Sequence, residues 1–214
     1  VALAHVALVL SGPARAAADP SLSELVAGHC RARAETSTLR TRFVQTRAFA
    51  ALGDEERSAG VLYYRRPDSL RWEYSEPDRS WTVVRGRRGW AVFPRIRQVQ
   101  TFDLGGTRVD GILSVVGFAA CGPAFARSFE ITEGSRADDG RPVLSLRPLR
   151  PELAASFARI ELALDPQDLL PRRVVLHEAS GDTISLEFRE LRRKVPLDPA
   201  LFEFTQPEHY SVSP

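Results

Sequence analysis

Side chains that commonly carry out chemistry are few in this chain and lie far apart. The 214 residues include two cysteines and four histidines, and these six residues form no cluster. Two cysteines without C-x-x-C spacing do not make a ligand set, so we expect no metal and no cofactor. No serine lies in a G-x-S-x-G elbow, and no phosphate-binding loop is present. The carboxylates are scattered over turns, so the sequence predicts a protein that is not an enzyme.

The two cysteines, Cys30 and Cys121, can also be considered as a pair. Disulfides persist in oxidising compartments. A bridge that closes so long a loop contributes about 4 kcal/mol in the chain-entropy model. The sequence does not show how close the two Cα atoms lie, so a bridged and an unbridged pair both remain open.

The first 18 residues have the pattern of a secretory signal peptide. Residues 1–10 are apolar apart from His5, Ser11-Gly12-Pro13 interrupts the run, and Ala16-Ala17-Ala18 supplies small residues for cleavage. The basic segment that normally precedes the apolar run is absent, so we expect the true start to lie upstream. We expect an exported protein whose mature domain covers residues 19–214. No later stretch approaches the ~20 apolar residues of a membrane span.

Composition indicates an ordinary globular domain without a polyanionic partner. Hydrophobic residues make up 43% and charged residues 26%, and 29 Lys and Arg against 27 Asp and Glu leave a net charge of +2. Nucleic-acid-binding domains usually show an excess or a cluster of basic residues. The balanced, dispersed charge therefore predicts no nucleic-acid partner.

The periodicity of the chain predicts one helix followed by a large antiparallel sheet. Ser21 and Glu24 form a capping-box pattern, and apolar residues at helical spacing predict a helix over 21–38. From Arg42 the period becomes two, with turn signals about every 8–12 residues, as in a β-meander. We expect roughly ten or eleven short strands, the last over 201–204, and an α+β fold.

A second helical pattern interrupts the meander at residues 107–120. Gly111 and Gly117 make this a weak helix, since each costs about 1 kcal/mol relative to Ala. It could be a movable cover or a plug for one end of a barrel, and both interpretations remain open. With so few helices to fill it, the concave side of one large sheet leaves an apolar cavity or groove.

Four motifs occur in a characteristic order along the chain. They are F-x-Q at 43–45, R-P-x-x-x-R-W at 66–72 within the run 60–77, the stretch 89–94 followed by Gln98-Val99, and L-D-x-x-x-F-x-F at 197–204. In this order they resemble the periplasmic outer-membrane lipoprotein carrier (LolA-type) family. The resemblance covers nearly the whole of residues 19–214, and its most specific part is the R-P-x-x-x-R-W core.

The resemblance implies an unclosed β-barrel with a helical lid and an apolar cavity for lipoprotein acyl chains. Carriers of this kind take a lipoprotein from an ATP-driven extractor in the inner membrane and deliver it to an outer-membrane receptor. We also expect a monomer that is located in the periplasm. The runner-up function is a sensor of lipid or lipoprotein with the same fold, or a dedicated glycolipid export carrier, acting through a membrane partner.

The resemblance assigns roles to individual residues. Arg66 stands where the family has the arginine that hydrogen-bonds the lid. Leu70 and Trp72 match residues of its cavity. The full set expected to line the cavity is apolar or aromatic: Leu70, Trp72, Tyr74, Trp90, Val92, Ile112, Leu113 and Val116. The residues alone leave open that Arg66 is a surface arginine before a turn, and that Trp72 and Tyr74 are ordinary core.

Overall fold

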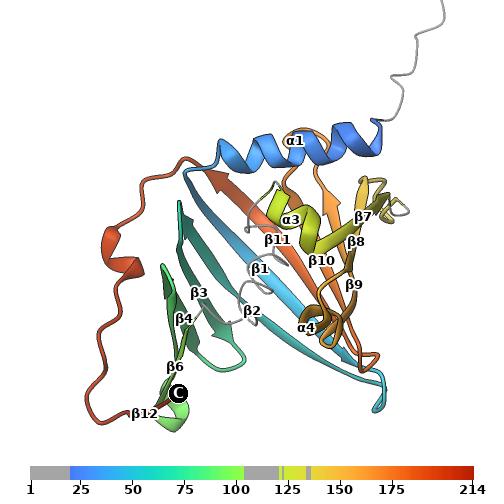
Figure 1. Cartoon of the computed structure of the whole chain (residues 1–214). Helices are drawn as coiled ribbons and strands as arrows, with labels where there is room; N and C mark the ends of the chain where they lie inside the picture. The colour runs from blue at the N-terminus through green and yellow to red at the C-terminus, as the bar shows by residue number, and fades with distance from the viewer. Residues whose placement is uncertain (1–19, 104–120, 122, 134–135) are drawn as a thin grey trace, which may run out of the picture.

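The computed structural model of the chain describes residues 20–103, 121, 123–133 and 136–214. Within these residues the main element is one strongly curved sheet of twelve strands (Figure 1). The strands are β1 (Thr38–Phe49), β2 (Asp54–Arg65), β3 (Ser69–Glu76), β4 (Ser80–Arg85), β5 (Arg88–Phe93), β6 (Gln98–Asp103), β7 (Phe129–Glu133), β8 (Val143–Pro148), β9 (Phe157–Leu164), β10 (Pro171–Glu178), β11 (Thr183–Arg193) and β12 (Ser211–Ser213).

The sheet is an unclosed barrel. Its spatial order is β12-β6-β5-β4-β3-β2-β1-β11-β10-β9-β8-β7, so β12 and β7 are the two edges and are not paired with each other. Each half is a meander, and the long β1 and β11 join the halves by antiparallel pairing. The expected α+β fold with one large unclosed sheet is confirmed, with twelve strands in place of the ten or eleven expected.

The additional strand comes from the C-terminal tail. β12 pairs in parallel with β6. The sheet was expected to be wholly antiparallel, and this one pair departs from that expectation. The prediction of a strand over 201–204 is wrong, because Pro199–Phe202 forms a 3₁₀ turn, η2. Asp198 caps this turn by accepting a hydrogen bond from the Ala200 N–H at 2.9 Å. Proline at the first position of the turn also favours it over a strand.

The helix α1 (Leu22–Ala34) begins as its sequence predicts. The Ser21 side chain accepts from the Glu24 N–H, and the Glu24 carboxylate accepts from the Ser21 N–H, which completes the capping box. The helix ends at Ala34, four residues before the expected 38, because Thr38 already pairs with Arg65 in the sheet. In Figure 1, α1 runs across one end of the curved sheet.

Besides η2, three short helical segments lie between strands: η1 (Pro94–Ile96), α3 (Pro123–Ser128) and α4 (Pro151–Ala154). The expected signal peptide over 1–18 and the expected helix over 107–120 lie outside the described residues.

Across the part of the chain that the structure describes, every helix is too short or too polar to span a bilayer.

The sheet has two chemically different faces. We call the face that packs against α1 the inner face and the opposite one the outer face. The buried side chains of the inner face form one apolar cluster with Leu25 of α1: Phe43, Leu62, Leu70, Trp72, Val84, Leu144, Leu146, Ile160, Leu162, Val174, Leu176, Leu186 and Phe188. These residues alternate along their strands with more polar ones, because successive side chains of a strand point to opposite faces.

Candidate functional site

The inner face carries the larger of the two buried apolar clusters among the described residues, and three of the predicted site residues belong to it or pack against it. Leu70 and Trp72 belong to its buried cluster, and Tyr74 packs against that cluster. All three come from β3, at alternate positions. Their alternation with Arg71 and Glu73 therefore identified the correct face of this strand.

Trp90 and Val92 lie on the outer face, so their assignment to the same surface is wrong. Thr82 of β4 pairs with Trp72 on one side and with Ala91 on the other. Directly paired residues share a face, so Ala91 belongs to the inner face and its two neighbours point outward. The indole of Trp90 stacks on Phe204 of the C-terminal tail, with ring centroids 5.0 Å apart. The tail thus covers apolar residues of the outer face.

Ile112, Leu113 and Val116, the other predicted lining residues, lie outside the described residues.

An aromatic group spans three strands of the inner face. The ring of Phe43 on β1 lies 5.0 Å from that of Trp72 and 5.1 Å from that of Tyr74, both on β3. The strand between them, β2, has Gly60 at this point, paired with Phe43 and Tyr74. A Cβ atom at Gly60 would lie 1.8 Å from the Glu73 backbone oxygen and 2.9 Å from Phe43 Cζ. Glycine is therefore needed here for the strands to approach and for the rings to meet.

Replacing Gly60 with alanine should destabilise the protein by about 1–3 kcal/mol, the usual cost of overpacking. The nearest obstacle is backbone, so relief requires movement of β3 itself. Urea unfolding monitored by circular dichroism measures the effect. Ser58→Ala, two residues away on β2, is the control and should change stability by less than about 0.5 kcal/mol. Equal midpoints for the two variants would contradict the close approach.

The middle of α1 is docked on the β9–β10 loop. His29, which is 4% exposed, has its Nδ1 2.8 Å from the Leu169 carbonyl oxygen. Only a protonated Nδ1 can donate to a carbonyl, so the hydrogen bond identifies the tautomer. Burial lowers the pKa of His29 to about 4; the hydrogen bond to Leu169 opposes this shift and the nearby Arg33 adds to it. His29 is therefore neutral at physiological pH.

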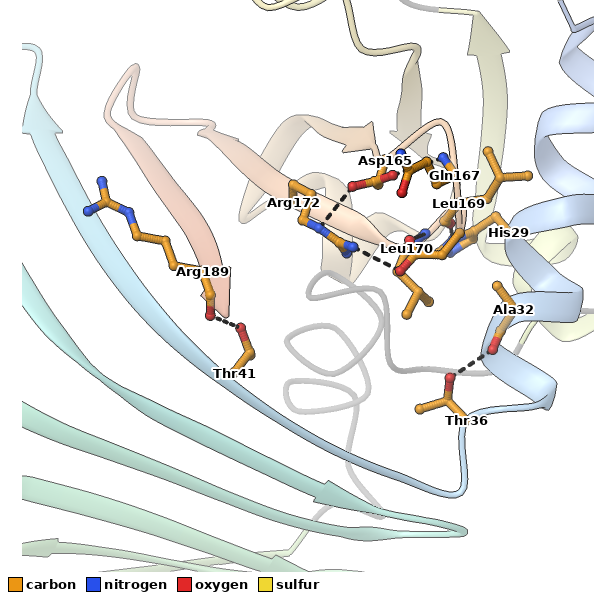
Figure 2. Close-up of polar contacts among 11 residues, drawn as sticks. His29, Ala32, Thr36, Thr41, Asp165, Gln167, Leu169, Leu170, Arg172 and Arg189 are labelled. Atoms are coloured by element: carbon orange, nitrogen blue, oxygen red, sulfur yellow. Dashed lines mark hydrogen bonds and ion pairs between the residues drawn. The ribbon is translucent and has the colours of Figure 1, made fainter. Parts of the chain in front are cut away.

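The loop that receives His29 is braced by ionic contacts (Figure 2). The guanidinium of Arg172 lies 3.2 Å from the Asp165 carboxylate and 2.8 Å from that of Asp168. The same two aspartates accept backbone N–H groups of Gln167 and Leu170. These contacts hold the Leu169 carbonyl in place, so the loop is a preformed dock for the helix.

The C-terminal end of α1 is bound by Arg66. The last carbonyls of a helix lack partners within the helix. The Thr36 hydroxyl donates to the Ala32 carbonyl at 2.8 Å, and the Arg66 guanidinium donates from Nη1 to that of Ala34. The cation also suits the negative end of the helix dipole. Arg66, directly after the end of β2, thus contacts α1 and is not a surface arginine without partners.

A disulfide joins α1 to residue 121. Cys30 and Cys121 are bonded, with their Cα atoms 5.5 Å apart. Arg33, one helical turn after Cys30, places its Nη1 3.4 Å from Cys121 Sγ. Burial lowers the pKa of Arg33 to about 10, partly opposed by Tyr64. The helix is therefore held by a covalent bond as well as by polar contacts.

A hollow of about 320 Å³ lies on the outer face of β8–β11, beside residues 136–138, and has a different chemistry. Its lining includes Arg173, Glu161 and His177. His177 Nε2 and Arg159 Nη2 lie 3.3 and 3.1 Å from the Glu161 carboxylate. Charged walls of this kind do not suit hydrocarbon chains.

Among the described residues, no three His, Cys, Asp or Glu side chains are grouped to hold a metal ion. Sequence reasoning missed Gln45, whose Oε1 accepts a hydrogen bond from the Tyr74 hydroxyl at 2.9 Å on the inner face. The F-x-Q motif contained the signal, but a pattern in one strand does not reveal a partner on a strand that is not its neighbour.

The fold and the site together define an open-barrel protein with an apolar inner face and a helix across one end of it, held through a few polar contacts and one disulfide. Comparison with known proteins narrows this class. Residues 34–205 match the family model described as outer membrane lipoprotein carrier protein LolA. The chain belongs to this family, as its motifs predicted.

Comparison with individual proteins supports the family assignment. The chain is 29% identical over 178 residues to an outer-membrane lipoprotein carrier protein of Alkalilimnicola ehrlichii, covering 83% of this chain and 78% of the relative. It is 26% identical over 175 residues to one from Methylococcus capsulatus, covering 82% and 80%. The crystal structure of a LolA superfamily protein from Nitrosomonas europaea shares the fold, with a TM-score of 0.50, 12% identity, and coverage of 86% of this chain and 99% of that one.

Proposed function

We propose that this protein is a periplasmic carrier that binds the acyl chains of lipoproteins against its inner face and moves them from the inner to the outer membrane. The observation that carries the proposal is the apolar inner face, with α1 across it and Arg66 bonded to the end of α1. The name of its relatives, outer-membrane lipoprotein carrier protein, supports the choice of cargo. The function is binding and transfer, not catalysis.

The proposal includes a signal peptide over residues 1–18 and a carrier domain over 19–214. The protein acts as a monomer between an ATP-driven extractor in the inner membrane and a receptor in the outer membrane. Its net charge of +2 gives no strong fixed attraction to either membrane. A carrier must dissociate from both membranes, and a nearly balanced charge favours this.

A carrier of acyl chains must release what it binds strongly. Each acyl CH₂ removed from water contributes about 0.8 kcal/mol, so the burial of three chains is very favourable. Bonds that exist only in the empty, closed state offset part of this gain when cargo enters. The Arg66 bond to Ala34 and the His29 bond to Leu169 are suited to this role, since both connect α1 to the sheet.

Arg66→Leu should therefore leave the fold intact and slow the release of cargo. The lost bond weakens the closed state by about 1 kcal/mol, which corresponds to roughly 3- to 10-fold slower handover. Transfer of a labelled lipoprotein to an acceptor measures the rate, and the melting curve checks the fold.

The control for this change is Arg85→Leu, which removes an exposed arginine at the end of β4. It should leave the transfer rate unchanged. If Arg66→Leu transfers cargo at the wild-type rate, Arg66 does not lock the helix.

Native mass spectrometry tests the function itself. The protein is exported to the periplasm together with a labelled triacylated lipoprotein and then purified without detergent. We expect a complex of one protein with one lipoprotein, and we expect this complex to pass its cargo to the outer-membrane receptor. Recovery of apo protein alone, under conditions that load an established carrier, contradicts the proposal. Loading without any handover favours the sensor function instead.

A further inference from the structure

The hollow on the outer face of β8–β11 has no part in the proposed function. Its volume of about 320 Å³ places it at the lower end of the range for small-molecule sites. It is too small and its walls are too charged for an acyl chain. A ligand for it must therefore be small and at least partly polar.

Short side chains bordered by long ones create the hollow. Val143, Ala163 and Arg173 are direct partners across β8, β9 and β10, so they share the outer face. Val175 lies two residues after Arg173 and therefore on the same face. All four line the hollow, so three short apolar side chains lie next to one long cationic side chain.

The loop between β7 and β8 forms another wall, through Arg136, Ala137 and Asp138. The Ala137 carbonyl accepts from the Gly140 N–H at 2.8 Å, and the Ala137 N–H donates to the Arg141 carbonyl at 3.0 Å. The Arg136 guanidinium donates to the Gly140 carbonyl at 2.7 Å. These hydrogen bonds shape the wall without any help from a ligand, so the hollow is preformed.

Arg173 has hydrogen-bonding capacity that the protein does not use. Its Nε donates to the Ser185 hydroxyl at 3.2 Å, and within the described ranges neither Nη group has an acceptor. Glu187, its direct partner on β11, is bound instead to Arg189 at 2.8 Å. Arg173 is half-buried, so the hollow contains a cation without a counter-ion in the part of the chain that the structure describes.

The carboxylates of the hollow do not cancel this charge. Glu161 lies 3.1 Å from Arg159 Nη2 and 3.3 Å from His177 Nε2, so its charge is already balanced by a guanidinium. Asp138 is exposed, and water screens its charge. The hollow therefore favours an anion beside Arg173.

We propose that this hollow binds a small organic anion, with its carboxylate or phosphate group on Arg173 and a short apolar body on Val143, Ala163 and Val175. The two Nη groups of a guanidinium match either kind of anion through parallel hydrogen bonds. The site lies on the face opposite to the one assigned to acyl chains. The inference therefore goes beyond the carrier function and does not depend on it.

Four-carbon compounds test the two halves of the site in the wild-type protein. Butyrate and monobutyl phosphate carry both an anionic group and an apolar body, whereas butanol lacks the charge and inorganic phosphate lacks the body. NMR titration of the ¹⁵N-labelled protein at low salt, followed at the amides of Ala163 and Val175, gives the dissociation constants. The ratio for butyrate and monobutyl phosphate shows which anionic group is preferred.

We expect butyrate to bind about 10-fold more tightly than butanol, the effect of one charge-assisted hydrogen bond. Monobutyl phosphate should bind about 10-fold more tightly than inorganic phosphate, the effect of burying roughly two CH₂ groups. Equal affinities within either pair overturn the proposal. So does the absence of a saturable shift at Ala163 and Val175 with both organic anions.

One substitution locates the charge. Arg173→Gln should weaken binding of both organic anions about 10-fold and leave butanol unaffected. Arg147→Gln is the matched control, because it removes an exposed cation of β8 that does not line the hollow. An Arg173→Gln protein that binds the anions like the wild type overturns the site. If that variant fails to fold, the two wild-type comparisons decide, and none of these results changes the carrier proposal.

Discussion

Replacing both cysteines with serine, Cys30→Ser together with Cys121→Ser, should lower the free energy of unfolding by about 4 kcal/mol. The bridge connects residues that are 91 positions apart, so its loss restores a large number of conformations to the unfolded chain. Guanidinium unfolding of the oxidised wild type and of the double variant measures the difference. The double variant avoids the free thiol that a single substitution would leave.

A reducing agent provides the internal control for the bridge. It should bring the wild-type protein close to the double variant and leave the double variant unaffected. Hydrogen exchange should also become faster in α1, since Cys30 lies in that helix. If the oxidised wild type and the double variant unfold at the same denaturant concentration, the two cysteines are not bridged in solution.

The second large effect is a loss of stability in mild acid through His29. The pKa of His29 is about 4 in the folded protein, lowered chiefly by burial, against about 6.5 in the unfolded chain. The unfolded state therefore takes up a proton first as the pH falls. Stability from this residue is fully present above about pH 6.5 and is lost as the pH falls towards 4. The difference amounts to about 3 kcal/mol over that interval.

Urea unfolding at pH 7.5 and pH 4.5, for the wild type and His29→Gln, measures this contribution. Glutamine retains a donor for the Leu169 carbonyl but does not titrate. Other groups also titrate in this range, so the informative quantity is the difference between the two proteins. We expect the wild type to lose about 2–3 kcal/mol more than the variant. Equal losses would mean that His29 is not buried as a neutral side chain.

The elements that sequence reasoning located correctly depend on neighbouring residues. The capping box of Ser21 and Glu24 lies within one helical turn, and the alternation of Leu70, Trp72 and Tyr74 is a property of one strand. In each case the residues that determine the local structure are close together in the sequence. The order of the four family motifs then identified the open sheet, which no single strand specifies.

The errors arose where pairing between distant segments decides the outcome. Alternation shows that Trp90 and Val92 share a face, but the register with β4 decides which face it is. The outer face can carry the apolar side chain of Trp90, because Phe204 of the tail stacks on it. Similarly, no local pattern reveals that Arg66 reaches the Ala34 carbonyl or that Gly60 allows Gln45 to meet Tyr74.

The three tryptophans offer a direct test of which face holds the acyl chains. Trp72 lies on the inner face, whereas Trp90 is on the outer face with Trp81, which pairs with Val92. Two variants each retain one tryptophan: Trp81→Phe with Trp90→Phe leaves Trp72, and Trp72→Phe with Trp81→Phe leaves Trp90. Both must first be shown to fold and to bind the cargo.

The decisive measurement is fluorescence quenching of these two variants by a triacylated lipopeptide with brominated acyl chains. Bromine quenches indole emission only at short range, and the same lipopeptide without bromine is the control. If acyl chains occupy the inner face, the emission of Trp72 falls strongly and that of Trp90 does not change. Quenching of Trp90 with Trp72 unaffected would contradict the central claim that the inner face carries the cargo.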